Sequence, residues 1–161
     1  MTLLECGVIR RRHARAIVAS LPRQIADREL AVVRDRLGWS DAELETCVVE
    51  ASGPGNALLL EVASEHVTEL VSSFGEIGVR AETVAEQAAK EVRDYLAAGV
   101  AVGHHLADQL MLPMALAGGG AFRTIGLSLH SRTNLDVIRM FLPVRMTVRG
   151  RRDDVVVDIC S

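Results

Sequence analysis

The chain has 161 residues, a formal net charge of −3 and 49% hydrophobic residues. This length suits one ordinary domain or two small ones, and the apolar share is sufficient for a hydrophobic core, which excludes a disordered chain. Aromatic residues make up only 3% of the sequence, which excludes an aromatic platform for stacking single-stranded nucleic acid. The near-zero charge also argues against a basic surface that grips nucleic acid over the whole molecule.

The sequence predicts a protein of the cytoplasm that does not enter a membrane. Its longest uncharged stretch, Leu110 to Phe122, contains Pro113 and three glycines and falls short of the ~18 apolar residues that a membrane span needs. The opening segment MTLLECGVIRRRHAR has its basic cluster after its apolar part, which is the reverse of a secretory signal. Three widely separated cysteines follow no metal-ligand spacing and predict a reducing compartment: Cys6, Cys47 and Cys160.

The first part of the chain predicts a long strand and then a helix. The apolar residues 2–8, the arginines 10–12 and the apolar residues 16–19 together indicate strand structure with a basic middle. Leu21-Pro22 is typical of a helix start, and Gly38 is placed to end that helix. Its predicted apolar stripe consists of Ala26, Leu30, Val33 and Leu37.

Strand and helix patterns continue in the middle of the chain. Two predicted strands, Thr46–Glu50 and Ala57–Val62, flank the turn-forming residues Ser52–Asn56, which indicates a hairpin with a loop. A short strand over His66–Ser73 precedes a long helix from Ala81 to about Ala98. The apolar side of that helix carries Val84, Ala88, Val92 and Tyr95.

The character of the sequence changes after residue 99. Gly103–Ala117 is apolar and helix-like despite Pro113, Gly118–Gly120 breaks it, and Ala121–Leu129 is strand-like. The last predicted elements are a helix over Thr133–Phe141 with Thr133 as its cap, and a hairpin of Val144–Val148 and Val155–Ile159 around the charged turn Arg149–Asp154.

This order of elements predicts the α+β class. Residues 4–99 would form a small α/β sandwich of about four strands and two helices, with the helices on one face of a mainly antiparallel sheet. Residues 100–161 would form an incomplete βαβαββ-type unit. Because this second block has few elements to close a core by itself, we expect it to pack on something else.

His130 is the most informative of the five histidines. It directly follows the predicted strand and precedes a helix start, where backbone N–H groups and the positive end of the helix dipole favour a phosphate or carboxylate. A neutral imidazole is a competent nucleophile near pH 7 and can form covalent intermediates. The alternative is a structural histidine held by a hydrogen bond at a strand end.

Asp108 lies inside an otherwise apolar predicted helix, and a carboxylate at such a position requires an explanation. It could hold a metal ion, accept from a ribose hydroxyl or orient a histidine. His104 is four residues earlier, and a surface pair between the two residues is the simpler alternative.

Two other features have plain explanations. The arginine cluster of residues 10–12, with Arg15 and Arg23, could bind a polyanion or could be a solvated strand face. Gly118–Gly120 is no phosphate loop, because it follows a helix and no Lys-Ser/Thr pair comes after it; helix termination explains it.

Several separated motifs now point to one family. Four segments of this sequence closely resemble the C-terminal part of RNA 3'-terminal phosphate cyclases: HLADQLMLPMALAG at 105–118, His130, Thr133-Asn134 and FLPV at 141–144. Five earlier segments resemble that family's inserted small domain: LPR at 21–23, Ala26, RE at 28–29, GPGN at 53–56 and AE at 81–82.

The resemblance implies a three-step reaction on an RNA 3'-phosphate end. The histidine corresponding to His130 attacks the α-phosphorus of ATP, AMP passes to the 3'-phosphate, and the neighbouring 2'-hydroxyl displaces AMP to leave a 2',3'-cyclic phosphate. It also implies that the segment His105, Leu106, Ala107, Asp108 and Gln109 lines the ATP site, with Asp108 on the nucleotide or on its Mg²⁺ or Mn²⁺ ion.

Departures from the family pattern limit what this chain can do alone. Family members are substantially longer, and their preceding α/β units supply further contacts to ATP and RNA. We therefore expect an inactive or nearly inactive chain that needs a separate N-terminal half or self-associates. His13-Ala14 also stands where the family has an Arg-Gly pair. The alternatives are a non-catalytic cyclase-like binding or assembly module in RNA processing, and a small α+β interaction domain without a nucleotide.

Overall fold

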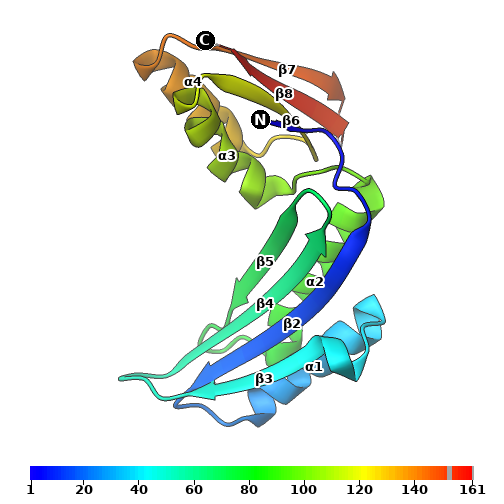
Figure 1. The fold of residues 1–161 in the computed structure, drawn as a ribbon. Coiled ribbons are helices and arrows are strands. Elements are labelled where there is room, and N and C mark those ends of the chain that lie inside the picture. Colours follow the sequence, from blue (N-terminus) through cyan, green and yellow to red (C-terminus); the bar gives the residue numbers. More distant parts are fainter. Residues whose placement is uncertain (152–153, 161) are drawn as a thin grey trace. The chain divides into compact units, whose positions relative to one another are not determined.

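The computed structural model describes residues 1–151 and 154–160. These residues form four α-helices and two four-stranded sheets (Figure 1), which confirms the predicted α+β class. The chain divides into two compact units: unit 1 comprises Met1–Ile9, Ser64–Glu69 and Tyr95–Ser161, and unit 2 comprises Arg10–Ala63 and Leu70–Asp94.

The elements follow one another along the chain with these bounds. The helices are α1 (Gln24–Leu37), α2 (Ala81–Ala98), α3 (His104–Leu116) and α4 (Leu129–Phe141), and a short 3-10 helix covers Asp41–Glu43. The strands are β1 (Thr2–Leu3), β2 (Ile9–Ala19), β3 (Leu44–Val49), β4 (Gly55–Ser64), β5 (Thr68–Phe74), β6 (Gly119–Thr124), β7 (Arg145–Arg151) and β8 (Asp154–Cys160).

The predicted strand at the beginning of the chain is two strands in different sheets. β1 contains only Thr2 and Leu3 and pairs in parallel with β6, whereas β2 starts at Ile9 and belongs to the other sheet. Between them Gly7 adopts a φ of 75°, a conformation that a strand does not use. The continuous strand predicted over residues 2–19 is therefore wrong, because hydrophobicity alone does not reveal such a break.

The sheet of unit 2 has the order β3-β2-β4-β5. β2 pairs in parallel with β3, from Ala14 opposite Leu44 to Ala19 opposite Val49, and Figure 1 shows β4 running opposite to its neighbours β2 and β5. The hairpin predicted between β3 and β4 is wrong, because β2 lies between these two strands. The turn-forming residues between β3 and β4 allow the chain to reverse, but they do not select the strand with which it pairs.

Helix α1 buries three of the four residues of its predicted apolar stripe, with Leu37 half-buried, and α2 buries all four of its own. Ala26, Leu30 and Val33 of α1 are buried, and the backbone N–H of Gly38 donates to the carbonyl of Arg34 at 2.9 Å to end the helix. α1 begins at Gln24, after Pro22, with Arg23 at the cap position. For α2 the predicted bounds and the four predicted buried residues are confirmed.

The sheet of unit 1 has the order β1-β6-β8-β7. The predicted terminal hairpin is confirmed, since β7 and β8 are antiparallel neighbours. Of the predicted turn Arg149–Asp154, residues 149–151 belong to β7 and Asp154 to β8, and residues 152–153 lie outside the described residues.

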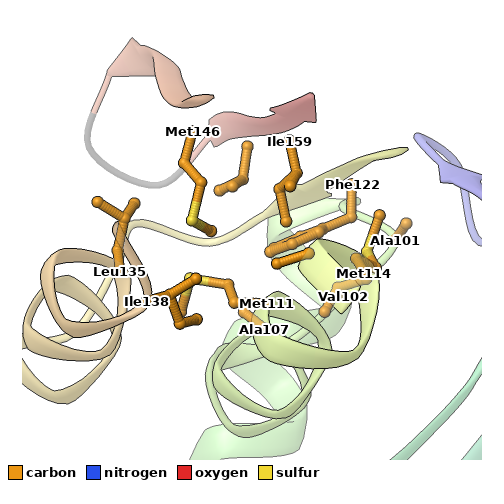
Figure 2. Close-up of a cluster of buried hydrophobic side chains, with 12 residues drawn as sticks. Ala101, Val102, Ala107, Met111, Met114, Phe122, Leu135, Ile138, Met146 and Ile159 are labelled. Atoms are coloured by element: carbon orange, nitrogen blue, oxygen red, sulfur yellow. The ribbon is translucent and has the colours of Figure 1, made fainter. Parts of the chain in front are cut away.

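The core of unit 1 is formed between this sheet and helices α3 and α4. Figure 2 shows Phe122 of β6, Met146 of β7 and Ile159 of β8 packed with Met111 of α3 and Ile138 of α4. Because both helices bury one face in the same cluster, their backbones are fixed relative to each other. Among the described residues no helix is both long and apolar enough to cross a bilayer.

Candidate functional site

The residues before His130 form a helix cap. Ser128 has extended φ and ψ angles of −64° and 169°, and its side-chain oxygen accepts the backbone N–H of Ser131 at 3.0 Å. The strand predicted as far as Leu129 and the cap predicted at Thr133 are therefore wrong. Apolar residues at 125, 127 and 129 alternate as in a strand, and this pattern concealed the helix start.

His130 thus lies in the first turn of α4 and is exposed. The first backbone N–H groups of a helix lack partners within the helix and carry its partial positive charge. An anion beside His130 would therefore be close to these N–H groups and to the positive end of the helix. The structure moves His130 from a strand end to a helix start, and it leaves the imidazole open to solvent.

Asp108 is tied to the helix that carries His130. The side-chain Nδ2 of Asn134 donates to the backbone carbonyl of Asp108 at 3.1 Å and to its carboxylate Oδ1 at 3.2 Å. Asn134 follows His130 by four residues, so both lie on the same face of α4. Asp108 of α3 is therefore next to the face of α4 that bears His130.

The five predicted nucleotide-binding residues of α3 do not share one face. His105 and Gln109 are exposed, and Asp108 is half-buried. Leu106 packs against the core of unit 1 and Ala107 lies within it, with 1% of its surface exposed. Successive helix residues differ by about 100° in direction, so five in a row cannot all point to one ligand.

The beginning of α3 is held by two polar contacts. The backbone N–H of Gly103 donates to Oε2 of Glu69 at 2.9 Å, and the Tyr95 hydroxyl donates to the carbonyl of Ala101 at 3.2 Å. Burial raises the pKa of the Tyr95 phenol, and the nearby charge of Glu69 raises it further. Tyr95 therefore stays neutral and remains a donor at physiological pH.

The simpler alternatives from the sequence differ in their outcome. One alternative was a surface pair of His104 and Asp108. The Asp108 carboxylate instead accepts from Asn134, and the buried Nδ1 of His104 has no hydrogen-bond partner within the described part of the chain. Three arginines of β2 are paired with glutamates: Arg11 with Glu61, Arg12 with Glu43 and Arg15 with Glu45. These pairs favour a solvated strand face over a polyanion site.

No ready-made metal site is found in the part of the chain that the structure describes. It contains no group of three or more His, Cys, Asp or Glu side chains able to hold an ion. The three cysteines are free thiols. Asp108 could supply one ligand to an ion that a nucleotide brings with its phosphates, which is how Mg²⁺ is commonly bound.

Asn134 is the residue of this site to which the sequence assigned no role. Its position four residues after a candidate nucleophile was visible in the sequence. Its partner on α3 was not visible, because the contact depends on how two helices pack.

Comparisons with known proteins agree with the motifs. The family model "RNA 3'-terminal phosphate cyclase (RTC), insert domain" matches residues 4–97. Proteins named RNA 3'-terminal phosphate cyclase are 50% identical over 141 residues in Pseudomonas aeruginosa (strain LESB58) and 44% identical over 149 residues in Koribacter versatilis (strain Ellin345). A third, from Salmonella enteritidis PT4 (strain P125109), is 44% identical over 160 residues.

These matches cover most of this chain but less than half of each relative. They cover 87%, 92% and 99% of this chain, but only 41%, 42% and 47% of the respective relatives. The chain therefore spans less than half the length of these curated relatives. Because the family model covers more than half of the chain, and the match to the Pseudomonas aeruginosa relative covers 87% of it, this chain belongs to the RNA 3'-terminal phosphate cyclase family.

Proposed function

We propose that this chain carries the adenylyl-accepting histidine of an ATP-dependent cytoplasmic ligase that converts an RNA 3'-phosphate end to a 2',3'-cyclic phosphate. The observation that carries the proposal is the bond of Asn134 to Asp108, which puts a carboxylate beside the face of α4 that bears the exposed His130. The family to which the chain belongs supports the same reaction.

The first step forms a bond from the unprotonated imidazole nitrogen of His130 to the α-phosphorus of ATP. The bond between the α-phosphorus and the bridging oxygen breaks, and pyrophosphate leaves with that oxygen. AMP, now on His130, is a transferable group, because the phosphorus–nitrogen bond is readily broken by another nucleophile.

The second and third steps take place on the RNA. An oxygen of the 3'-phosphate attacks the same phosphorus and displaces His130, which activates the RNA end. The 2'-hydroxyl then attacks the 3'-phosphorus, loses its proton and expels AMP. Because the hydroxyl is held next to the phosphorus in the same ribose, this ring closure has a high effective molarity.

Several residues of this chain would each contribute to the binding of ATP. His105 and Gln109 offer exposed polar groups on α3, and the Asp108 carboxylate can contact the ribose or a Mg²⁺ or Mn²⁺ ion that the ATP phosphates carry. The start of α4 favours the phosphates. Leu106 and Ala107 contribute from the core side by fixing α3.

We further propose that the chain is the C-terminal portion of the active enzyme and needs the rest for turnover. Each donor that stabilises a transferring phosphoryl group commonly contributes a factor of ~10²–10³ in rate. Since the relatives are more than twice as long as the matched segment, several such donors would lie outside this chain.

The test follows label from ATP. The chain is incubated with ATP labelled in its α-phosphate and Mg²⁺ or Mn²⁺, both alone and with the portion of a Pseudomonas aeruginosa relative that this chain does not match. We expect acid-labile, alkali-stable label on the chain in the complemented mixture and little or none without it. The label should vanish in His130→Ala and persist in His66→Ala, a matched change at another exposed histidine.

Two results would contradict the proposal. Label that survives in His130→Ala would remove the assignment of the nucleophile. Tight association of the two portions with no label under any condition would favour a non-catalytic assembly module.

A further inference from the structure

Unit 2 contains a cavity of about 580 Å³ that the proposed reaction does not use. Three segments line it: the beginning of α1, the beginning of β4, and the loop between β5 and α2, which come together at one end of the sheet (Figure 1). Its volume lies within the ~300–1,000 Å³ typical of ligand sites. Several motifs that resemble the family's inserted domain lie at this cavity: Leu21, Arg28, the Pro54–Asn56 segment and Ala81.

Aliphatic side chains form the walls of the cavity. Leu21 and Ile25 come from the α1 side and Val79 and Val84 from the α2 side, while Ile77 lies at the open edge of the cavity. Ile77 is fully exposed and Val79 is 41% exposed, so apolar surface continues from the cavity to the solvent. Exposed apolar surface around a cavity is typical of a ligand-binding site.

Two guanidinium groups stand at the same cavity. Arg28 and Arg80 both line it, and their side chains are 52% and 77% exposed. Both contact the carboxylate of Glu82 at 3.4 Å. A guanidinium has five N–H donors, so each arginine keeps donors for a phosphate, although Glu76 also lines the cavity and reduces the positive charge.

Asn56 presents a fixed hydrogen-bond acceptor at the cavity. Its Nδ2 donates to the carbonyl of Ile17 at 3.3 Å and to Oε2 of Glu29 at 2.9 Å, which uses both N–H groups. Its Oδ1 lies directly over Gly75, where a β-carbon would collide with it. The side chain is thereby held in one orientation, and within the described residues its Oδ1 accepts no hydrogen bond.

We propose that this cavity binds one nucleotide of single-stranded RNA. The base would lie between the aliphatic walls, an amino group of the base would donate to Oδ1 of Asn56, and the phosphate would meet Arg28 and Arg80. Proteins hold unstacked bases between apolar as well as aromatic side chains, so the scarcity of aromatic residues is no obstacle. The proposal rests on the proposed function for the choice of RNA, but it involves neither His130 nor ATP.

The experiment measures binding of the whole chain to a 10-nucleotide RNA that carries a fluorophore at its 5' end and a hydroxyl at its 3' end. Arg80→Ala and Ile77→Ser remove one contact each at exposed positions, so both variants should fold. Matched controls in the same unit are Arg34→Ala, whose partner is Asp41, and Val48→Ser, which is 59% exposed on β3. We expect each cavity variant to bind about tenfold more weakly, and each control to bind as the unchanged chain does.

A second measurement locates the RNA directly. The backbone amide signals of Gly55, Gly75 and Gly78 should shift in nuclear magnetic resonance spectra as the RNA is added, because these glycines line the cavity. Unshifted glycine signals, equal losses in the cavity variants and the controls, or a failure of the RNA to bind would each overturn the proposal. Preferential capture of an apolar peptide by the same cavity would overturn it as well.

The two proposals fail separately. RNA binding should persist in His130→Ala, and adenylyl label should persist in Arg80→Ala. Binding without label would contradict only the proposed reaction, whereas label without binding at the cavity would contradict only this inference.

Discussion

At Gly119 and Gly120 the chain approaches other backbone too closely for any side chain. Gly120 has a φ of 151°, and a β-carbon there would collide with the carbonyl oxygen of Met1 and the Met114 side chain; at Gly119 it would collide with the carbonyl oxygen of Ile159. Helix termination explains only Gly118, whose φ is 88° and around which there is open space. The sequence interpretation of the three glycines was therefore incomplete.

This difference predicts unequal costs of two alanine substitutions. Gly118→Ala should lower the free energy of unfolding by about 1 kcal/mol, because only the left-handed backbone is strained. Gly120→Ala should lower it by about 3 kcal/mol, because a steric collision is added to the backbone strain. Urea denaturation followed by circular dichroism measures both, and equal losses would show that the collision relaxes without cost.

Glu29 is a buried carboxyl group in unit 2 whose ionisation opposes folding. Burial raises its pKa above the ordinary value of 4.5, and this effect is partly opposed by the hydrogen bond from Asn56 and by the charge of Arg28. Above pH 4.5 the unfolded chain releases this proton while the folded chain retains it. The contribution of Glu29 to stability is therefore largest in acid, falls as pH rises toward the folded-state pKa, and is constant above it.

Glu29→Gln should remove this pH dependence. The glutamine can still accept from Asn56, so the variant should be more stable than the unchanged chain at pH 7, and the difference should shrink toward pH 4. Urea midpoints at several pH values test this, with Glu50→Gln as a control at an exposed position. A difference that does not change with pH would contradict the assigned cause.

At the scale of elements, the start of α4 decides where His130 lies. The Ser128 side chain accepts from the backbone of Ser131 and also contacts the Ser131 hydroxyl at 3.0 Å. Ser128→Ala should lower the free energy of unfolding by about 1 kcal/mol, as is usual for a lost helix cap. Adenylyl label should fall as well, because the first turn that carries His130 frays.

Thermal unfolding and label incorporation measure the two effects. Ser52→Ala is the matched control, since that residue is exposed in the loop before β4. A change in stability without a change in label would show that the position of His130 does not depend on this cap.

Helices α1 and α2 could be predicted because their signal is local. The stripes of α1 and α2 and the stop at Gly38 follow from residues three or four positions apart. Strand partners depend on distant segments, so the insertion of β2 between β3 and β4 could not be found from turn residues. In the candidate site, His130 and Asp108 were candidates from the sequence, but the contact that joins their helices required the structure.

At the scale of the whole molecule, unit 1 exposes large apolar side chains on the helices of the candidate site. Leu112 and Leu116 of α3 are 45% and 68% exposed. On α4, Leu129, Met140 and Phe141 are between 79% and 83% exposed. Scattered apolar residues are ordinary, but several large ones on two adjacent helices are typical of an interaction surface.

We therefore expect the chain to self-associate when it is alone in solution. Sedimentation velocity should show a mass that rises with concentration, because pairing two such surfaces removes apolar area from water. The double variant Met140→Ser/Phe141→Ser should shift the equilibrium toward monomer, while Val48→Ser on β3 should not. Adding the unmatched portion of a relative should also reduce self-association if that portion covers the same helices. A monodisperse monomer at all concentrations would contradict this expectation. The rest of the enzyme would then be needed only for the chemistry of the site and not to cover these helices.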